Sequence, residues 1–138
     1  MTFRIDNSDL SALAADLGDI ADDAGRNVRK AVEVTARNVK DAWAEKLRGE
    51  AHVPHAPRSI TYDIEGTAGI GGSEIRAEIG AERGRLQAPI VTVLEYGAPG
   101  NNLAPRGYGA GALKENEADF ERGLSIALGD AERSGGFR

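Results

Sequence analysis

The chain has 138 residues, of which 41% are hydrophobic and only 5% aromatic, and its formal net charge at neutral pH is −5. This length fits a single domain over residues 1–138 with a modest aliphatic core. The absence of cysteine excludes disulfides and thiolate metal sites. Because the sequence has neither a signal-peptide pattern nor a long apolar run, we expect a soluble, cytoplasmic chain without a membrane span.

Apolar or small side chains recur every three or four residues along the first third of the chain. They are Leu10, Leu13, Leu17, Ile20, Ala24, Val28, Ala31, Thr35, Val39 and Ala42. The mean step is about 3.6 residues, the helical period, which predicts an N-terminal helical arm within residues 1–50. One straight helix over residues 8–47 would run roughly 60 Å, whereas a domain of this size is about 40 Å across. The arm therefore either folds back on itself or reaches a partner.

Gly25 divides this arm into two halves of opposite charge. A glycine in a helix interior costs about 1 kcal/mol relative to alanine, so we expect a kink or a break there. The pattern leaves open two alternatives. Residues 8–48 form either one helix or two helices, the first over 8–24 and the second over 26–48. The first half is strongly acidic and the second is basic, with seven Lys or Arg against three Asp or Glu over residues 26–48. The two halves pair within the chain or between copies, or each is a solvated face.

Residues 58–97 carry the pattern of a small sheet. Apolar and polar residues alternate over 58–65 and again over 73–79, with a glycine-rich connection between them, which predicts an antiparallel hairpin. The apolar run over residues 90–94 predicts a buried third strand, with a short helix as the alternative.

The last third begins with a loop and ends with a helix. Residues 98–111 are rich in glycine, proline and asparagine, which predicts a long loop with a functional role or no fixed structure. Apolar residues at helical spacing, among them Leu113, Phe120 and Leu124, predict an amphipathic helix over 112–132. Helices that segregate from an antiparallel sheet indicate an α+β fold.

Few residues suggest chemistry. His52 and His55 are spaced for a metal, but Pro54 breaks the helix that would align them, and no cysteine completes the set. Neither Ser59 nor Ser73 lies in a nucleophile-elbow pattern. The glycines of residues 107–111 match neither the dinucleotide fingerprint nor the P-loop, although a lone anion at the following helix N-terminus stays open. We therefore predict no catalytic, cofactor-binding or metal-binding residues.

Two short motifs carry a resemblance to a known family. They are Pro-Arg-Ser-Ile at residues 57–60 and Val-Thr-Val-Leu-Glu-Tyr-Gly at residues 91–97. Together with the long helix before them and the proline-bearing loop and helix after them, they resemble the small tail-completion, head–tail joining (neck) proteins of long-tailed bacteriophages. The resemblance spans about residues 8–130.

The resemblance implies a structural protein of the virion, present in the host cytoplasm during assembly. Family members form rings, often of six subunits, between the capsid connector and the tail tube, with no cofactor. The implied partners are further copies of the chain and adjacent connector and tail proteins. No specific nucleic-acid binding is implied, although DNA would pass through the ring. The implied interface residues are Arg29, Arg37, Trp43, Glu95, Tyr96, Gly97, Pro105 and Tyr108.

Three other readings stay open. A tail-terminator ring would have closely similar properties, and only its place in the particle would distinguish it. A cytoplasmic partner-binding module is the second alternative. A small enzyme that uses His52, His55 and nearby carboxylates is the third. For Trp43, burial in the core or at a helix–sheet seam competes with a role as an intersubunit anchor.

Overall fold

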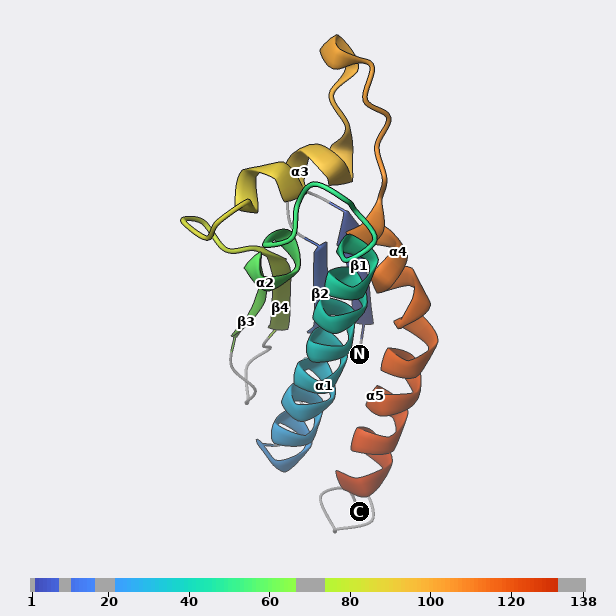
Figure 1. Cartoon of the computed structure of the whole chain (residues 1–138). Helices are drawn as coiled ribbons and strands as arrows, with labels where there is room; N and C mark the ends of the chain where they lie inside the picture. The colour runs from blue at the N-terminus through green and yellow to red at the C-terminus, as the bar shows by residue number, and fades with distance from the viewer. Residues whose placement is uncertain (1, 8–10, 17–21, 67–73, 132–138) are drawn as a thin grey trace.

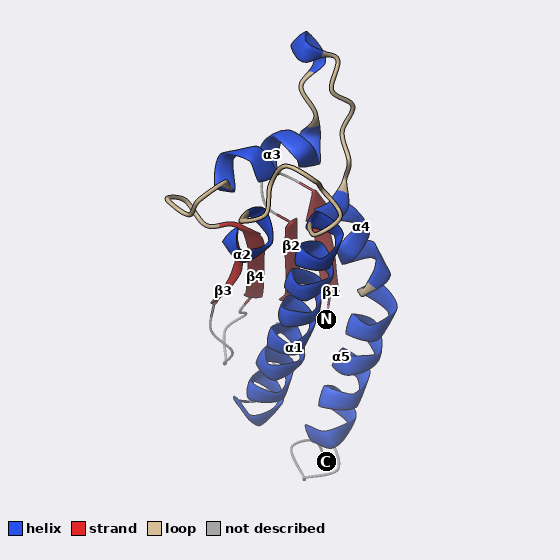
Figure 2. Ribbon diagram, viewed as in Figure 1, coloured by secondary structure: helices blue, strands red, loops and turns tan. Residues whose placement is uncertain are grey.

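The computed structural model describes residues 2–7, 11–16, 22–66 and 74–131, with side chains described for 25–66 and 74–129. In chain order the elements are β1 (Thr2–Asn7), β2 (Ser11–Asp16), α1 (Asp22–Leu47), α2 (Ala56–Ser59), β3 (Ile60–Glu65), β4 (Glu74–Ala81), α3 (Ala88–Tyr96), the short 3-10 helix η1 (Pro99–Asn101), α4 (Tyr108–Glu115) and α5 (Glu117–Ala131). The sheet forms one layer, and α1 with α5 beside it forms a second layer against one face (Figures 1 and 2). The expected α+β class is confirmed.

The sheet has the strand order β1-β2-β4-β3, and every neighbouring pair is antiparallel. The predicted hairpin of β3 and β4 is confirmed, with Ile75, Ala77 and Ile79 fully buried. The other two strands come from the N-terminal segment, which pairs with the free edge of β4 from Ser11 opposite Ile79 to Asp16 opposite Glu74.

The predicted helix over residues 8–24 is therefore wrong at residues 11–16, whereas residues 22–24 are helical as the beginning of α1. Although the helical stripe runs from residue 10 to residue 42, residues 11–16 form a strand because pairing with β4 outweighs the helical spacing there. Five positions of the predicted stripe, at residues 10, 13, 17, 20 and 24, lie outside the residues whose side chains are described.

The long helix itself is confirmed, beginning at Asp22 and ending at Leu47. It is not interrupted at the buried Gly25, so the expected break there is wrong. Burial of Val28, Val32 and Val39 against the sheet outweighs the cost of one glycine in the helix.

The predicted third strand at residues 90–94 is a helix instead. In α3, the side chains of Ala88, Val91, Leu94 and Glu95 point inward at helical spacing. Both edges of β4 are already occupied by β2 and β3, so no central place in the sheet was left for this run. Its proline lies in the first helical turn, where a missing amide donor costs little.

The predicted loop and last helix are confirmed in outline but have different bounds. The loop ends at Gly107, whose φ of +61° precedes α4. The last helix is split into α4 and α5 at Asn116, whose side-chain amide donates a hydrogen bond to the carbonyl of Ala112 at 2.8 Å. No helix in the described part of the chain is long and apolar enough to span a bilayer.

Phe120 is the largest fully buried side chain among those that the structure describes, and it joins α5 to the core. We expect Phe120→Ala to lower the free energy of unfolding by about 3–5 kcal/mol, because it leaves a cavity that the helices cannot close. Urea unfolding followed by Trp43 fluorescence measures this. Ser125→Ala, at an exposed position on the same helix, should change the free energy of unfolding by no more than about 0.5 kcal/mol. If the two variants lower it equally, Phe120 does not join α5 to the core.

Candidate interaction surface

Glu95 ties the end of α3 to the beginning of α4. Its side chain is only 6% exposed, and its two carboxylate oxygens accept hydrogen bonds from the backbone amides of Gly109 at 2.6 Å and Ala110 at 3.1 Å. Amides in the first turn of a helix have no helical acceptor and favour a negative charge. Glu95 therefore acts as a cap supplied from fourteen residues away. The anion that the sequence left open at this helix N-terminus is the protein's own carboxylate.

Gly97 begins the loop with a φ of +79°. A Cβ on this residue would lie 2.7 Å from the carbonyl oxygen of Leu103 and 2.8 Å from the nitrogen of Pro105. Only glycine fits this backbone angle and this close approach.

Residues 98–107, called here the projecting loop, extend away from the rest of the molecule beyond α3 (Figure 1). Ala98 and Leu103 exchange backbone hydrogen bonds of 2.9 and 3.1 Å, which join the two arms below the tip. At the base, the amides of Arg106 and Gly107 donate to the carbonyls of Leu94 and Glu95. Both ends of the loop are thus fastened to α3.

The base of the loop is also bound to the C-terminal end of α1. Glu50 accepts a 2.6 Å hydrogen bond from the hydroxyl of Tyr108 and lies 3.3 Å from Nε of Arg106. Lys46 forms a 2.7 Å ion pair with Glu115 of α4. Glu50 was missed from the sequence, because a glutamate after a helix gives no signal of such long-range partners.

Trp43 lies in the core at 3% exposure, which supports the core reading over that of an intersubunit anchor. Gly109 packs directly on it, since a Cβ at Gly109 would lie 2.8 Å from the indole ring. The indole nitrogen has no hydrogen-bond partner among the residues described.

The outer side of α3 is apolar and lacks charge. Leu86 before the helix is 65% exposed, and Ile90, Val93 and Tyr96 are 40%, 41% and 40% exposed. These four residues are called here the α3 face. The charged residue of the helix, Glu95, points inward. A helix that is hydrophobic on all sides is typical of a buried environment, so this face has the character of a contact surface.

A groove runs between α1 and α5. Its volume is about 320 Å³, and it is lined by Asn27, Lys30, Ala31, Val34, Thr35, Asn38, Asp119, Gly123, Ile126 and Ala127. Val34 and Ile126 are 45% and 60% exposed. The set is called here the α1–α5 groove. The sequence did not indicate it, because both residues read as ordinary members of amphipathic helices.

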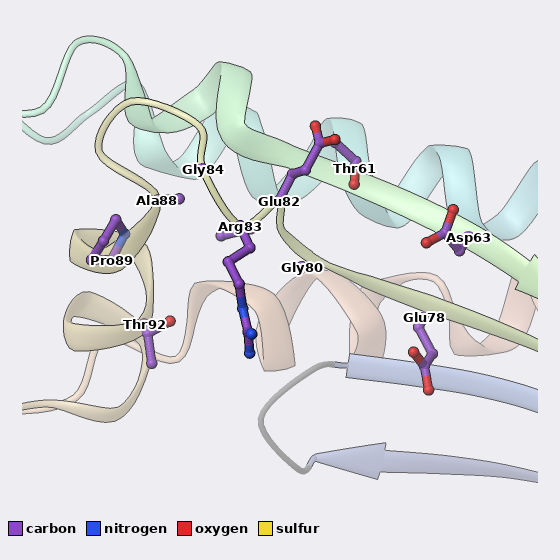
Figure 3. A pocket seen from close by; sticks show the side chains of 11 residues that line it. Thr61, Asp63, Glu78, Gly80, Glu82, Arg83, Gly84, Ala88, Pro89 and Thr92 are labelled. Carbon is purple, nitrogen blue, oxygen red and sulfur yellow. The ribbon is translucent and has the colours of Figure 1, made fainter.

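A larger hollow of about 760 Å³ separates α3 from the outer face of the β3–β4 hairpin (Figure 3). Asp63 and Glu78 lie opposite each other in the strand register, and Arg83 extends between Thr92 and Glu78 in the view of Figure 3. Glu78 is paired with Arg76 at 3.1 Å. The lining combines these charged groups with apolar residues such as Ala81, Ala88 and Pro89.

Two further predicted interface residues, Arg29 and Arg37, are bonded within the fold. Arg29 donates to the carbonyl of Gly66 at 3.0 Å. A hydrogen bond with Tyr62, with smaller help from Glu33, raises the pKa of Arg37 above its usual range. Pro105 lies against Gly97, and Tyr96 belongs to the α3 face. The interface role of all of them stays a prediction.

The structure does not bring the candidate chemical groups together. His52 and His55 are exposed, and no group of three histidine or acidic side chains among the described residues could hold a metal ion. Ser59 is buried and donates to the carbonyl of Ala56. Ser73 lies outside the described residues.

Comparison with known proteins returns no match to a family model, a curated protein or a solved structure.

The capping role of Glu95 is testable. Glu95→Gln should lower the free energy of unfolding by about 1–3 kcal/mol, because a buried charged acceptor is replaced and one amide loses its partner. Hydrogen exchange should accelerate selectively at the amides of Gly109 and Ala110. Glu121→Gln, an exposed change on α5, is the control. Unchanged protection of both amides in the Glu95 variant would refute the cap.

Tyr108 should titrate abnormally. Its hydrogen bond to Glu50, with partial burial and the charge of that carboxylate, raises the pKa of Tyr108, while Arg106 acts weakly in the opposite direction. Because the folded-state pKa lies above the unfolded one, the stabilisation is complete below the ordinary tyrosine pKa. It is lost as pH rises through the raised value. In phenolate absorbance titrations with Tyr108→Phe as the reference, Glu50→Gln should bring this pKa down. If the pKa of Tyr108 is the same in the unmodified chain and in the Glu50→Gln variant, the interaction is excluded.

Proposed function

We propose that this chain is a structural subunit of the phage head–tail connector, a tail-completion ring component that acts by self-assembly and docking rather than by catalysis. Its partners would be further copies of itself and adjacent connector and tail proteins, with DNA passing through the ring without specific binding. The protein would reside in the neck of the virion and pass through the host cytoplasm during assembly.

One observation carries this proposal, namely that the exposed, charge-free α3 face adjoins a firmly anchored projecting loop. An apolar helix face is stabilised when another surface covers it. The loop is fixed at its base by Glu95, Gly97 and Glu50 but presents Pro99–Asn101 to solvent. A pre-organised protrusion of this kind can dock against a neighbour with little loss of backbone freedom.

The resemblance around residues 91–97 supports the same proposal. Two of the residues that carry it, Glu95 and Gly97, hold the base of the loop, so the motif coincides with the part of the fold best suited to docking. A tail-terminator ring subunit is the alternative with the same surfaces. A cytoplasmic partner-binding module is the less favoured one.

Mass spectrometry of purified virions that carry this gene tests the assignment. We expect the chain in intact particles at a constant ratio to connector proteins, and labelling within the particle separates the connector from the tail terminator. Absence from the particles would reject both virion roles.

A matched pair of variants tests the role of the α3 face. Val93→Glu should weaken incorporation or self-association by at least about tenfold, because a buried contact would enclose an unpaired charge. Thr92→Glu makes a similar charge change at the neighbouring residue, which lines the hollow beside the β3–β4 hairpin rather than the α3 face, and should have little effect. Circular dichroism checks that both variants fold. Equal incorporation of the two would argue against the α3 face.

A further inference from the structure

The sheet ends in two outer strands, β1 and β3, and each of them pairs with one other strand in the described part of the chain (Figure 2). Unpaired backbone groups on an outer strand can bind a further strand, so proteins commonly protect such edges with proline, lysine or a β-bulge. Neither strand contains proline or lysine, and each pairs with its neighbour over six consecutive residues without a bulge. Both edges are therefore suited to pairing.

The backbone of β3 directs half of its hydrogen-bonding groups to the free edge. The amide of Glu82 donates to the carbonyl of Ser59 at 2.7 Å, which continues the β3–β4 ladder by one pair. Because hydrogen-bonded and non-hydrogen-bonded pairs alternate in an antiparallel ladder, every second residue of β3 from Thr61 bonds to β4. Tyr62 and Ile64 then direct their N–H and C=O groups to the free edge. Their side chains are only partly buried against the core, so an added strand would cover them further.

The two edges fit each other in direction. All neighbouring strands in the order β1-β2-β4-β3 are antiparallel, so β1 and β3 run in opposite directions. Pairing of β3 with β1 of another copy would therefore be antiparallel and would keep the helices of both copies on the same side. Four strands span about 19 Å and two packed helices roughly 16–20 Å, so α1 and α5 leave room for the helices of the next copy.

The two edges also differ in charge. The charged residues of β3 are Asp63 and Glu65, which are exposed and have no ion-pair partner in the described part of the chain. Two copies of β3 would repel each other, because like charges on facing strands are destabilising. Strand β1 supplies a basic residue, Arg4, beside the acidic Asp6. The favoured occupant of the β3 edge is therefore β1 of a second copy.

We propose that β3 of one copy of this chain pairs antiparallel with β1 of the next copy, with Asp63 opposite Arg4. In this register the apolar residues of the two strands face each other on the helix side of the sheet. A shift by two residues would place Thr2 or Asp6 opposite Asp63, so the charges favour one register. The contact is head-to-tail and forms a ring or a filament, according to the rotation between copies. The proposal deepens the proposed function, on which it rests, by naming the self-assembly surface.

A charge exchange tests the register. Asp63→Arg places two arginines opposite each other, and Arg4→Asp places two carboxylates there. Each change should weaken self-association by at least about tenfold in analytical ultracentrifugation. The double variant Arg4→Asp with Asp63→Arg restores opposite charges and should recover most of the loss. Glu121→Arg, the matched charge change at an exposed position on α5, should have little effect, and circular dichroism checks that all variants fold.

Disulfide trapping provides an independent measurement, because the chain has no cysteine of its own. Arg4 and Asp63 would form a non-hydrogen-bonded pair, in which facing Cα atoms lie about 4.5 Å apart. A mixture of Arg4→Cys and Asp63→Cys proteins should form a cross-linked dimer on oxidation, and the double variant should form a ladder. Arg4→Cys mixed with Glu121→Cys is the control and should stay uncross-linked.

Three results would overturn the proposal. They are an unmodified chain that stays monomeric at the highest attainable concentration, a double charge variant that associates no better than the single ones, and cross-linking of Arg4→Cys to itself in place of Asp63→Cys. The last result would indicate a symmetric contact between two β1 strands. In each case detection of the chain in virions would still support the proposed function, so failure of the strand pairing and failure of the virion assignment are distinguishable.

Discussion

The contact between the Glu95 carboxylate and the first amides of α4 determines how the upper part of this molecule is arranged. It joins α3 to α4 across the projecting loop and satisfies backbone donors that would otherwise lack a partner. Gly97 allows the chain to turn beside this contact, and Glu50 adds a second attachment from the end of α1. The loop therefore rises from a base held by three separate parts of the fold, namely α1, α3 and α4.

Local patterns were sufficient for some elements and insufficient for others. The α1 stripe and the alternation of β3 and β4 are long or regular enough to specify their own structure, and both were predicted. Residues 11–16 and 88–96 are short, and their conformation depends on which edges of β4 are free. The first segment pairs with one of those edges and becomes a strand, and the second finds none and becomes a helix. Neither outcome is encoded within the segment itself.

The same distinction applies to the candidate surface. The motif at residues 91–97 immediately precedes the predicted loop, and its glycine adopts a positive φ. The partner of Glu95 lies fourteen residues further on, and no spacing rule connects the two. The α3 face was overlooked for a related reason, since an apolar run with little polar interruption is typical of buried structure. In the folded structure the outer side of this helix is exposed, with Val93 at its centre. The sequence of the helix alone does not show which of its sides the neighbouring elements cover.

The tip of the projecting loop lies beyond all of these attachments. Pro99 and Gly100 are exposed, a side chain at Gly100 would meet no neighbour within 4 Å, and the hydrogen bonds that join the arms use backbone atoms alone. Residues at the tip are thus free to diverge in evolution without disturbing the fold. In the proposed docking role, single substitutions at the tip would change the partner that is recognised, while the domain that carries the tip remains the same.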